Sequence, residues 1–530
     1  MTDLLPDTEP RGSAPRSGKE SGLLRASGIT GSMTLVSRIL GLARDVVIAR
    51  VFGTSEGADA FLLANRIPNF MRRLFAEGAF NQAFVPVLSE YRSTRSLADV
   101  QLLISGVAGS LGGFLFVLTF LFIVAAPIVA IPIGFGWYTD QPAKFALFVE
   151  MLRITFPYLL LISMTALCGS ILNSYGRFAI PAITPALLNV SLIASAFLLA
   201  PFMRVPELAL AWGVLIAGVA QLLFQMPLLA RMHLLPKPRL VKGHEGVVRI
   251  KRLMIPALFG VSVSQINMLL DSIIASFLVT GSVSWLYYSD RLMELPLGTF
   301  GIAIAVAVLP SLSRKHAESS TAEFSETLDW ALRIVCLIAI PATLGLILIA
   351  EPLMVTLFQN DNFTVRDVIN SANSLRAYAF GLLAFMAIKI FAPGFYARQN
   401  TKTPVVIGVI AMAANMAMNI GFYLLGMAHV GLALATSLAA FLNAGLLLQG
   451  LRKDGVFYFQ TGWMVFLLRL AMANIAVALL LILGMGDWQV WLEWEMFRKV
   501  SQLSALVVGS VLVYGITLYA AGLRWKDLHR

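Results

Sequence analysis

The sequence of 530 residues has little charge and almost no cysteine. Only 13% of its residues are Asp, Glu, Lys or Arg, whereas 58% are hydrophobic, and the mean hydropathy is +0.79. This balance excludes an ordinary soluble globular chain and predicts a polytopic membrane protein. The two cysteines, Cys168 and Cys336, lie in apolar runs without metal-ligand spacing, so we expect neither a disulfide framework nor a zinc site.

Signatures of enzymes and of nucleic-acid binding are also missing. The sequence contains no GxxxxGK[ST] phosphate loop and no HExxH motif, and no loop between apolar runs is long enough for a soluble catalytic domain. We therefore expect no enzymatic activity and no bound cofactor. The net charge of +11 comes from basic residues spread over short loops, so membrane topology explains it better than a nucleic-acid partner does.

Apolar runs of about 20 residues, each long enough to cross a bilayer as a helix, recur along the whole chain. They predict an all-α polytopic membrane protein with fourteen transmembrane helices. Because the second run is too long for one span and contains two prolines, we expect a kink or a break in it, with 78–91 near the interface. The predicted helices are 26–51, 57–92, 99–131, 145–174, 181–201, 207–233, 247–280, 283–315, 326–350, 367–397, 403–425, 429–451, 461–485 and 497–523.

A weak internal repeat divides these helices into two lobes. Gly57 and Pro86 recur at Gly281 and Pro310 with one constant offset of 224 residues. Parallel repeats of this kind build two lobes around a central site, although apolar segments of similar composition also match by chance. We predict a disordered cytoplasmic tail at 1–24, an N-lobe at 25–233, a C-lobe at 247–451 and two further helices at 461–523.

The distribution of basic residues predicts the orientation in the membrane. If the N-terminus is cytoplasmic, the inner segments hold most of the lysines and arginines, including a cluster at 231–252 and another at 524–530. The outer loops then hold few. This positive-inside bias places both termini in the cytoplasm.

The apolar run at 26–51 carries charges where lipid-soluble residues are expected. Wound as a helix, its polar residues Ser37, Arg38, Arg44 and Asp45 fall with several small residues on one arc of about 140°. An ionised side chain at the bilayer centre costs about 2.5–3.5 kcal/mol on insertion scales, so it normally faces a partner or a water-filled cavity. We interpret the stripe as one wall of a cavity for an anion.

Two other predicted helices carry charges to the same depth, among them Arg72 and Arg291. Arginine is the informative residue type because its planar fork binds phosphate through paired hydrogen bonds and keeps its proton. Two alternatives remain open. The nearby carboxylates can instead neutralise the arginines in purely structural pairs, and Lys389 can either reach the inner interface or line the cavity of the C-lobe.

Four stretches of the sequence resemble the MurJ/MviN family of bacterial lipid II flippases, which belongs to the MATE-like multidrug/oligosaccharidyl-lipid/polysaccharide exporter superfamily. They are SRILGLARD at 37–45, NFMRRLFAEGAFNQAFVPVLSEY at 69–91, GSVSWLYYSDRLMELP at 281–296 and APGFYARQNTKTP at 392–404. The resemblance covers about residues 25 to 525. It implies two lobes, alternating access and a bacterial inner-membrane location. The implied cargo is lipid II, a polyprenyl pyrophosphate carrying a disaccharide-pentapeptide, moved from the cytoplasmic to the periplasmic leaflet.

The resemblance also implies roles for single residues. The family's essential cavity arginines correspond to Arg38, Arg44, Arg72 and Arg291. Further positions implicated in transport correspond to Asp59, Glu77, Ser284 and Lys389. We complete the predicted supporting set with Ser37, Asp45 and Asp290. The helices at 461–523 resemble the family's groove for the polyprenyl tail.

The source of energy stays open. Without a nucleotide site, uphill movement draws on an ion gradient or on the membrane potential. Some relatives bind sodium through acidic and amide groups, and the corresponding candidates are Asp271, Asn415 and Asn419. The second of the two helices concerned has no carboxylate here, which leaves sodium coupling open.

Three other functions compete with this interpretation. A MATE-like exporter of drugs or cations would be expected to line its cavity with carboxylates rather than arginines. A flippase for another polyprenyl-linked oligosaccharide shares the pyrophosphate, so the charges cannot distinguish it. A membrane scaffold for peptidoglycan-synthesis enzymes would need no charges within the membrane. The expected partners are lipid II and membrane lipids, and partnership with those enzymes stays open.

Overall fold

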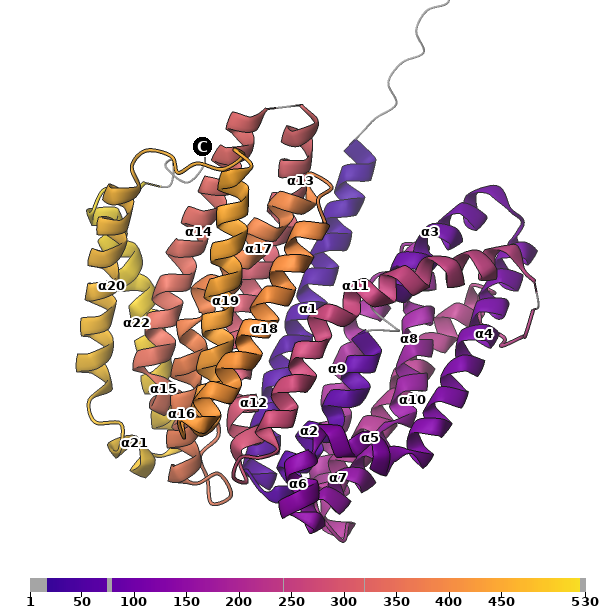
Figure 1. Cartoon of the computed structure of the whole chain (residues 1–530), viewed down its shortest axis with the longest axis horizontal. Coiled ribbons are helices and arrows are strands. Elements are labelled where there is room, and N and C mark those ends of the chain that lie inside the picture. Colours follow the sequence, from indigo (N-terminus) through magenta and orange to yellow (C-terminus); the bar gives the residue numbers. More distant parts are fainter. Residues whose placement is uncertain (1–16, 74–78, 242, 319, 525–530) are drawn as a thin grey trace, which may run out of the picture.

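The computed structural model describes residues 17–73, 79–241, 243–318 and 320–524. Every regular element in these ranges is a helix, as the predicted all-α fold requires (Figure 1). The two cysteines are buried and free.

The first half of the chain forms one helical bundle, on the right in Figure 1. Within it, α1 packs along α9, and α9 packs along α10. Its helices are α1 (Ser17–Phe52), α2 (Glu56–Arg72), α3 (Ala79–Thr94), α4 (Leu97–Val124), α5 (Ala126–Ile133), α6 (Phe135–Asp140), α7 (Pro142–Thr155), α8 (Pro157–Ser174), α9 (Ala179–Leu198), the 3₁₀ helix η2 (Ala200–Phe202) and α10 (Leu208–Arg231).

The second half forms another bundle, in which α20 and α22 lie outermost and pack on each other and on α14 and α15 (Figure 1). The helix α11 (Glu245–Ala275) connects the two bundles, because it packs along α3 of the first bundle and on α18 of the second (Figure 1). The other helices of the second bundle are α12 (Ser282–Pro296), the π-helical η3 (Leu297–Gly301), α13 (Ile302–Ala317), α14 (Thr321–Leu348), α15 (Ala350–Leu357), α16 (Val365–Phe380), α17 (Leu382–Tyr396), α18 (Lys402–Leu424), α19 (Ala428–Lys453), α20 (Trp463–Met485), α21 (Val490–Glu493) and α22 (Met496–Ala520).

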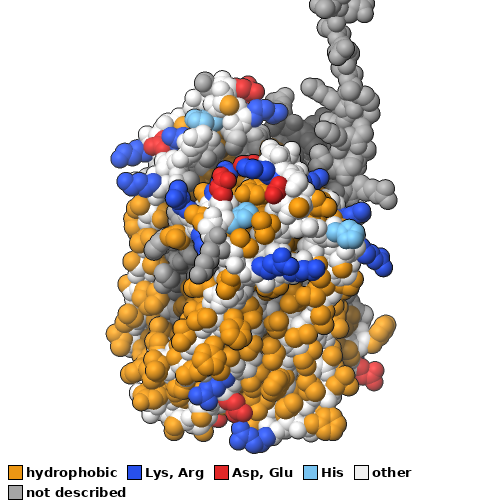
Figure 2. All heavy atoms as spheres, turned by 90° about the vertical axis from the view of Figure 1, so that its right-hand side faces the viewer, with side chains coloured by type: hydrophobic (Ala, Val, Ile, Leu, Met, Phe, Trp, Pro, Cys, Tyr) orange, Lys and Arg blue, Asp and Glu red, His pale blue; other side chains and the backbone are white. Residues whose placement is uncertain are grey.

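The surface and the helix lengths agree with a membrane-spanning protein. Within the described ranges, 11 helical segments are long and apolar enough to cross a membrane, by length and composition. Figure 2 shows a broad hydrophobic surface around the middle of the molecule, with charged side chains gathered mainly above and below it. Each predicted span overlaps at least one of the observed helices, but the count of fourteen spans stays a prediction.

Several predicted helices are divided into two. The long second run is described as α2 and α3, and one of its two prolines lies inside each of these helices. Residues 74–78, which connect them, lie outside the described residues. The helix α2 ends at Arg72, and α12 ends 224 residues later at Pro296, which is the offset of the sequence repeat. A division at Phe156 has a local cause, because Pro157 has no N–H with which to continue the hydrogen bonds of α7 into α8.

The predicted N-terminal tail lies mostly outside the described residues, which begin at 17. The helix α1 begins at Ser17 and so includes residues 17–24. Once a helix exists, each added residue gains a hydrogen bond without the cost of nucleation, which favours extension of the membrane helix into its polar flank.

Hydrogen bonds between the two bundles gather where α1 ends, at the lower end of Figure 1. Thr54 donates to an Asp367 carboxylate oxygen at 2.7 Å, and Arg50 donates to the Thr356 carbonyl at 3.0 Å. The Asn362 side chain donates to the Arg50 carbonyl at 3.0 Å. Gly53 permits this approach, because it has a φ of +63° and any Cβ there would collide with the Asn362 carbonyl. The bundles are therefore joined at this end, and their ribbons diverge toward the start of α1.

Candidate anion-binding cavity and lipid groove

A cavity of about 400 Å³ lies where α1, α12, η3 and α17 come together. It brings together three of the predicted anion-binding arginines, although they are far apart in the sequence. Its lining contains four basic side chains and two carboxylates, an excess of two positive charges. The lining residues are Arg38, Gly41, Leu42, Arg44, Asp45, Arg291, Glu294, Leu295, Leu297, Gly298 and Lys389.

Arg44 is held in place by three neighbours. Its Nε and Nη2 donate to Asp45 Oδ1 at 3.0 and 2.6 Å, its Nη2 also lies 3.0 Å from the Tyr287 hydroxyl, and its Nη1 donates to Asn189 Oδ1 at 3.1 Å. The Tyr287 hydroxyl donates to the same Asp45 oxygen at 2.9 Å. Because these partners come from α1, α9 and α12, the guanidinium has one fixed orientation at the cavity wall, with 13% of the side chain exposed.

Arg291 is less enclosed. Its Nη1 lies 2.7 Å from Glu294 Oε2, its guanidinium carbon lies 5.0 Å from the centroid of the Tyr287 ring, and its Nε lies 3.9 Å from Asp45 Oδ2. The side chain is 37% exposed. The predicted alternative of structural pairing is thus partly correct, because Arg44 and Arg291 both contact carboxylates. The pairing does not neutralise the cavity, since the two carboxylates serve four basic groups.

Arg38 and Lys389 supply the remaining basic groups. Gly298 in η3 leaves room for Arg38, because a Cβ at this glycine would collide with the Arg38 guanidinium. The sequence predicts that Lys389 reaches the inner interface or lines the cavity. It lies on α17 and lines the cavity.

Other predicted cavity residues lie elsewhere. Arg72 ends α2 and donates from Nε to Asn69 Oδ1 at 3.3 Å, and it is not among the residues that line the cavity. Ser37 and Asp290 are also outside the lining. Each directly precedes a lining arginine, and a helix turns by about 100° per residue, so their side chains leave the axis in another direction. Glu77 lies outside the described residues.

Asp59 and Ser284 belong to a separate, buried junction between the bundles, which corrects their prediction as cavity residues. Asp59 Oδ2 accepts from Lys144 Nζ at 2.9 Å and from the Gly281 N–H at 2.8 Å. Its Oδ1 accepts from the Ser284 N–H and hydroxyl at 3.0 and 2.6 Å. The carboxylate of α2 thus caps the N-terminus of α12, where free N–H groups and the helix dipole favour a negative charge.

Sequence reasoning overlooked the cavity roles of Tyr287 and Asn189, whereas Glu294 is one of the carboxylates expected to pair with the arginines. A signal existed for Tyr287, because it lies four residues before Arg291 and therefore shares its helix face. For Asn189 the only signal is an amide within the apolar run of α9.

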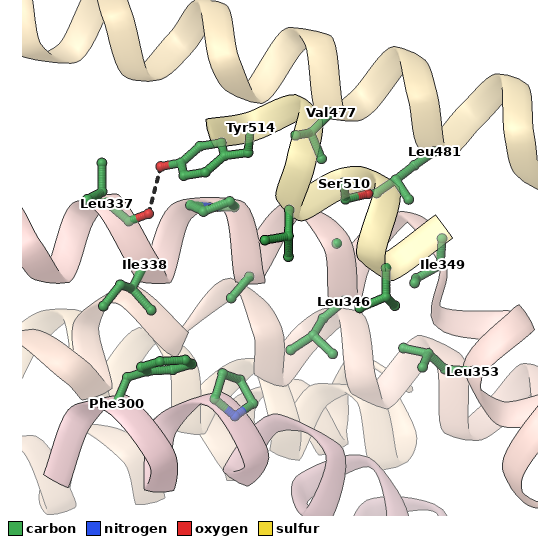
Figure 3. Close-up of a pocket in the computed structure, with 16 residues that line it drawn as sticks. Phe300, Leu337, Ile338, Leu346, Ile349, Leu353, Val477, Leu481, Ser510 and Tyr514 are labelled. Atoms are coloured by element: carbon green, nitrogen blue, oxygen red, sulfur yellow. Dashed lines mark hydrogen bonds between the residues drawn. The ribbon is translucent and has the colours of Figure 1, made fainter. Parts of the chain in front are cut away.

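An apolar groove of about 400 Å³ lies between α14 and the outer helices α20 and α22 (Figure 3). Its lining contains two hydroxyl groups. The Tyr514 hydroxyl donates to the Leu337 carbonyl at 2.6 Å, and the Ser510 hydroxyl is buried. The groove is lined by Pro296, Phe300, Leu337, Ile338, Pro341, Ala342, Gly345, Leu346, Ile349, Leu353, Val477, Leu481, Val507, Ser510, Val511 and Tyr514.

The π-helical segment η3 and the end of α12 form a wall between the groove and the cavity. Pro296 and Phe300 line the groove, whereas Leu297 and Gly298 line the cavity. The charged cavity and the apolar groove therefore lie on two sides of the same short segment. Interruptions of this kind inside helices occur frequently at functional sites.

The predicted cation-binding residues also meet. Asn419 Nδ2 donates to Asp271 Oδ1 at 2.7 Å and to Asn415 Oδ1 at 3.1 Å, and Asn415 lies 3.5 Å from the Thr436 hydroxyl. The two asparagines are buried on α18. One carboxylate together with neutral oxygens is a donor set that suits a hard monovalent cation better than a transition metal.

Comparisons with known proteins identify relatives of this chain. A family model described as "Lipid II flippase MurJ" matches residues 48–500. A probable lipid II flippase MurJ of Haemophilus influenzae is 48% identical over 510 residues, which cover 94% of this chain and 99% of that protein. A probable lipid II flippase MurJ of Vibrio cholerae is 48% identical over 513 residues, covering 96% of this chain and 97% of that protein.

Solved structures show the same fold. A lipid II flippase MurJ in an inward closed conformation has a TM-score of 0.77 and 26% identity, covering 94% of this chain and 99% of that chain. An inward-facing multidrug resistance MATE family transporter of the MOP superfamily has a TM-score of 0.65 at 14% identity, covering 81% of this chain and 98% of that one. The chain therefore belongs to the lipid II flippase MurJ family.

Proposed function

We propose that this protein translocates lipid II from the cytoplasmic to the periplasmic leaflet of the bacterial inner membrane by alternating access. The observation that carries the proposal is the cavity with an excess of two positive charges at the meeting of the two bundles. An anionic headgroup compensates such an excess, whereas a cationic drug would be repelled. The same observation disfavours an exporter of cations and a scaffold that transports nothing.

The pyrophosphate binds to the arginines of the cavity. Arg44 is already oriented by Asp45, Tyr287 and Asn189, so binding requires little further loss of side-chain entropy. The more exposed Arg291 and the neighbouring Arg38 complete the site. Bidentate contacts from planar guanidinium groups match two linked phosphates better than the point charge of a lysine does.

The polyprenyl tail lies in the apolar groove while the headgroup occupies the cavity. The groove is almost free of polar atoms, and η3 separates it from the charged chamber. Burial of apolar surface stabilises the tail by about 25 cal/mol per Å² relative to water, but much less relative to lipid, so the groove guides the tail more than it binds it.

The orientation follows from the positive-inside distribution, with both termini in the cytoplasm. The joined ends of the bundles, around Thr54 and Asp367, then lie on the periplasmic side. In this conformation the cavity receives lipid II from the cytoplasmic side. Rocking of the two bundles opens the periplasmic junction and exposes the same arginines outside.

The energy source is the membrane potential, a sodium gradient or both. Moving one elementary charge across 100 mV is worth about 2.3 kcal/mol, so a few mobile charges are sufficient to couple rocking to voltage. Asp271, Asn415 and Asn419 would hold a sodium ion, and the ion would neutralise the carboxylate within the membrane. Lipid II itself does not bind at this site.

Depletion of the protein in a growing bacterium tests the proposal. We expect lipid II to accumulate in the cytoplasmic leaflet, where a membrane-impermeant probe of the headgroup cannot reach it. Accumulation of a different polyprenyl-linked oligosaccharide would favour the alternative flippase. An unchanged distribution of every lipid-linked precursor between the leaflets would contradict both. The same assay with and without the main peptidoglycan synthases shows whether they are needed as partners.

A further inference from the structure

Arg66 is a cation of the N-terminal bundle that the cavity does not use. It lies on α2, seven residues after Asp59, which places it about 10 Å farther along the helix from the periplasmic junction. Its Nη1 donates to the Ser272 hydroxyl on α11 at 2.7 Å. Ser272 is fully buried. The Arg66 side chain of α2 therefore contacts a buried serine of α11.

The place that Arg66 reaches is the predicted cation site. Ser272 directly follows Asp271, whose carboxylate accepts from Asn419 on α18 at 2.7 Å. The positive charge of Arg66 acts on the Asp271 carboxylate. It also acts on Asp290 of α12, which Arg291 compensates as well. The site is thus built from helices of the second bundle, while its counter-charge comes from the first.

We infer that the Arg66 guanidinium compensates the negative charge of the Asp271 site in this conformation. A sodium ion takes its place when the bundles separate at their periplasmic ends, around Thr54 and Asp367. The inference rests on the proposed function, because it assigns a coupling role to the proposed sodium site. It needs no residue of the cavity.

The physical reason is that the carboxylate must be compensated in both conformations. A carboxylate left alone within the membrane is costly, and a sodium ion beside a guanidinium is repelled in a medium of low dielectric constant. Arg66 moves with α2, whereas Asp271, Asn415 and Asn419 move with the second bundle. Separation therefore removes the guanidinium and leaves a negative site that attracts a cation. Sodium favours the separated conformation, and Arg66 favours the joined one.

Sodium binding to the purified full-length protein tests the inference. The thermal unfolding midpoint is followed while sodium chloride replaces choline chloride at constant ionic strength. We expect Arg66→Gln to reach half of its sodium-dependent stabilisation at a concentration about 10-fold or more below that of the unmodified protein, because the competing charge is gone. Arg66→Lys keeps the charge and should resemble the unmodified protein. Asp271→Asn should remove the sodium response in either background.

The matched control is Arg204→Gln, which removes an exposed arginine paired with Glu150 within the first bundle and should leave the sodium curve unchanged. Equal sodium curves for Arg66→Gln and the unmodified protein would overturn the inference, as would a sodium response that survives Asp271→Asn. If Arg66→Gln does not fold, Ser272→Ala removes only the hydrogen bond and should shift the curve in the same direction by a smaller factor. Absence of any sodium response, together with accumulation of lipid II on depletion, would reject this inference while leaving the proposed transport intact.

Discussion

Two charged centres of this protein, both formed by intramembrane helices, differ in their balance and their exposure. At the junction, Asp59 and Lys144 form a pair whose side chains are each 1% exposed, and both carboxylate oxygens are hydrogen-bonded. In the cavity, Arg291 is 37% exposed, Glu294 is 46% exposed, and two positive charges remain in excess. A buried and balanced ion pair therefore fits a structural role, whereas the unbalanced and accessible charges of the cavity fit the proposed transport site.

This difference in balance and exposure predicts that the Asp59–Lys144 pair serves stability and that the cavity serves transport. A fully buried pair is satisfied by the protein itself, so the loss of one partner leaves an uncompensated charge and costs about 3–5 kcal/mol. The cavity arginine Arg291 is 37% exposed and keeps access to water when it is not bound to cargo, so its removal should have little effect on folding.

The largest expected effect is the loss of transport on Arg44→Ala. The variant as the only copy should not support growth. Its thermal midpoint should fall less than that of a variant at the Asp59–Lys144 pair, because Tyr287 still donates to Asp45 and the charge of Arg291 lies 3.9 Å from it. Arg44→Lys should also fail, because lysine keeps the charge and loses the bidentate fork. Complementation of a depletion strain measures both variants. Normal growth on Arg44→Ala would show that the cavity arginines are not the pyrophosphate site.

The next largest effect concerns the junction. Asp59→Ala should destabilise the protein by about 3–5 kcal/mol, because it leaves Lys144 charged and buried and uncaps α12. A large fall in the thermal midpoint measures this loss. The double variant Asp59→Ala with Lys144→Met should recover part of it, since no charge is then left unpaired. A single variant that stays stable and loses only transport would place Asp59 with the cavity residues instead.

A smaller effect is expected in the lipid groove. Gly345 lines the groove, and a Cβ at this position meets no atom within 4 Å, so Gly345→Phe should fill the groove without a collision. We expect several-fold slower transport and an unchanged or higher thermal midpoint. The matched control is Gly515→Phe on α22, which has equal space around its Cβ and does not line the groove. Equal transport by the two variants would contradict a role of the groove in holding the tail.

The smallest effect is expected at the surface. Arg204 and Glu150 form an ion pair with side chains 76% and 44% exposed. Arg204→Gln should change the stability by less than about 1 kcal/mol and leave transport unchanged, because exposed pairs are screened by water and salt. The thermal midpoint and the complementation assay check this. A large loss of stability or transport would show that exposure does not distinguish the dispensable charged groups of this protein from the important ones.

The membrane class, the helical segments and the arginine stripe of α1 could be predicted from the sequence. These features are local: apolar runs are set by neighbouring residues, and the position of Arg38 and Arg44 on one side of a helix follows from the helical period. The offset of 224 residues, which also relates the ends of α2 and α12, was visible for the same reason.

Only the tertiary structure decided which charge meets which. Asp59 pairs with Lys144, 85 residues away, and Arg44 meets Tyr287, 243 residues away. In the tertiary structure Asp59 and Ser284 lie outside the predicted cavity, and Lys389 lines it. Arg66 lies beside the Asp271 site. The physical reason is that the sequence sets the face of a helix on which a side chain lies. The rotation and packing of two bundles set what that face contacts.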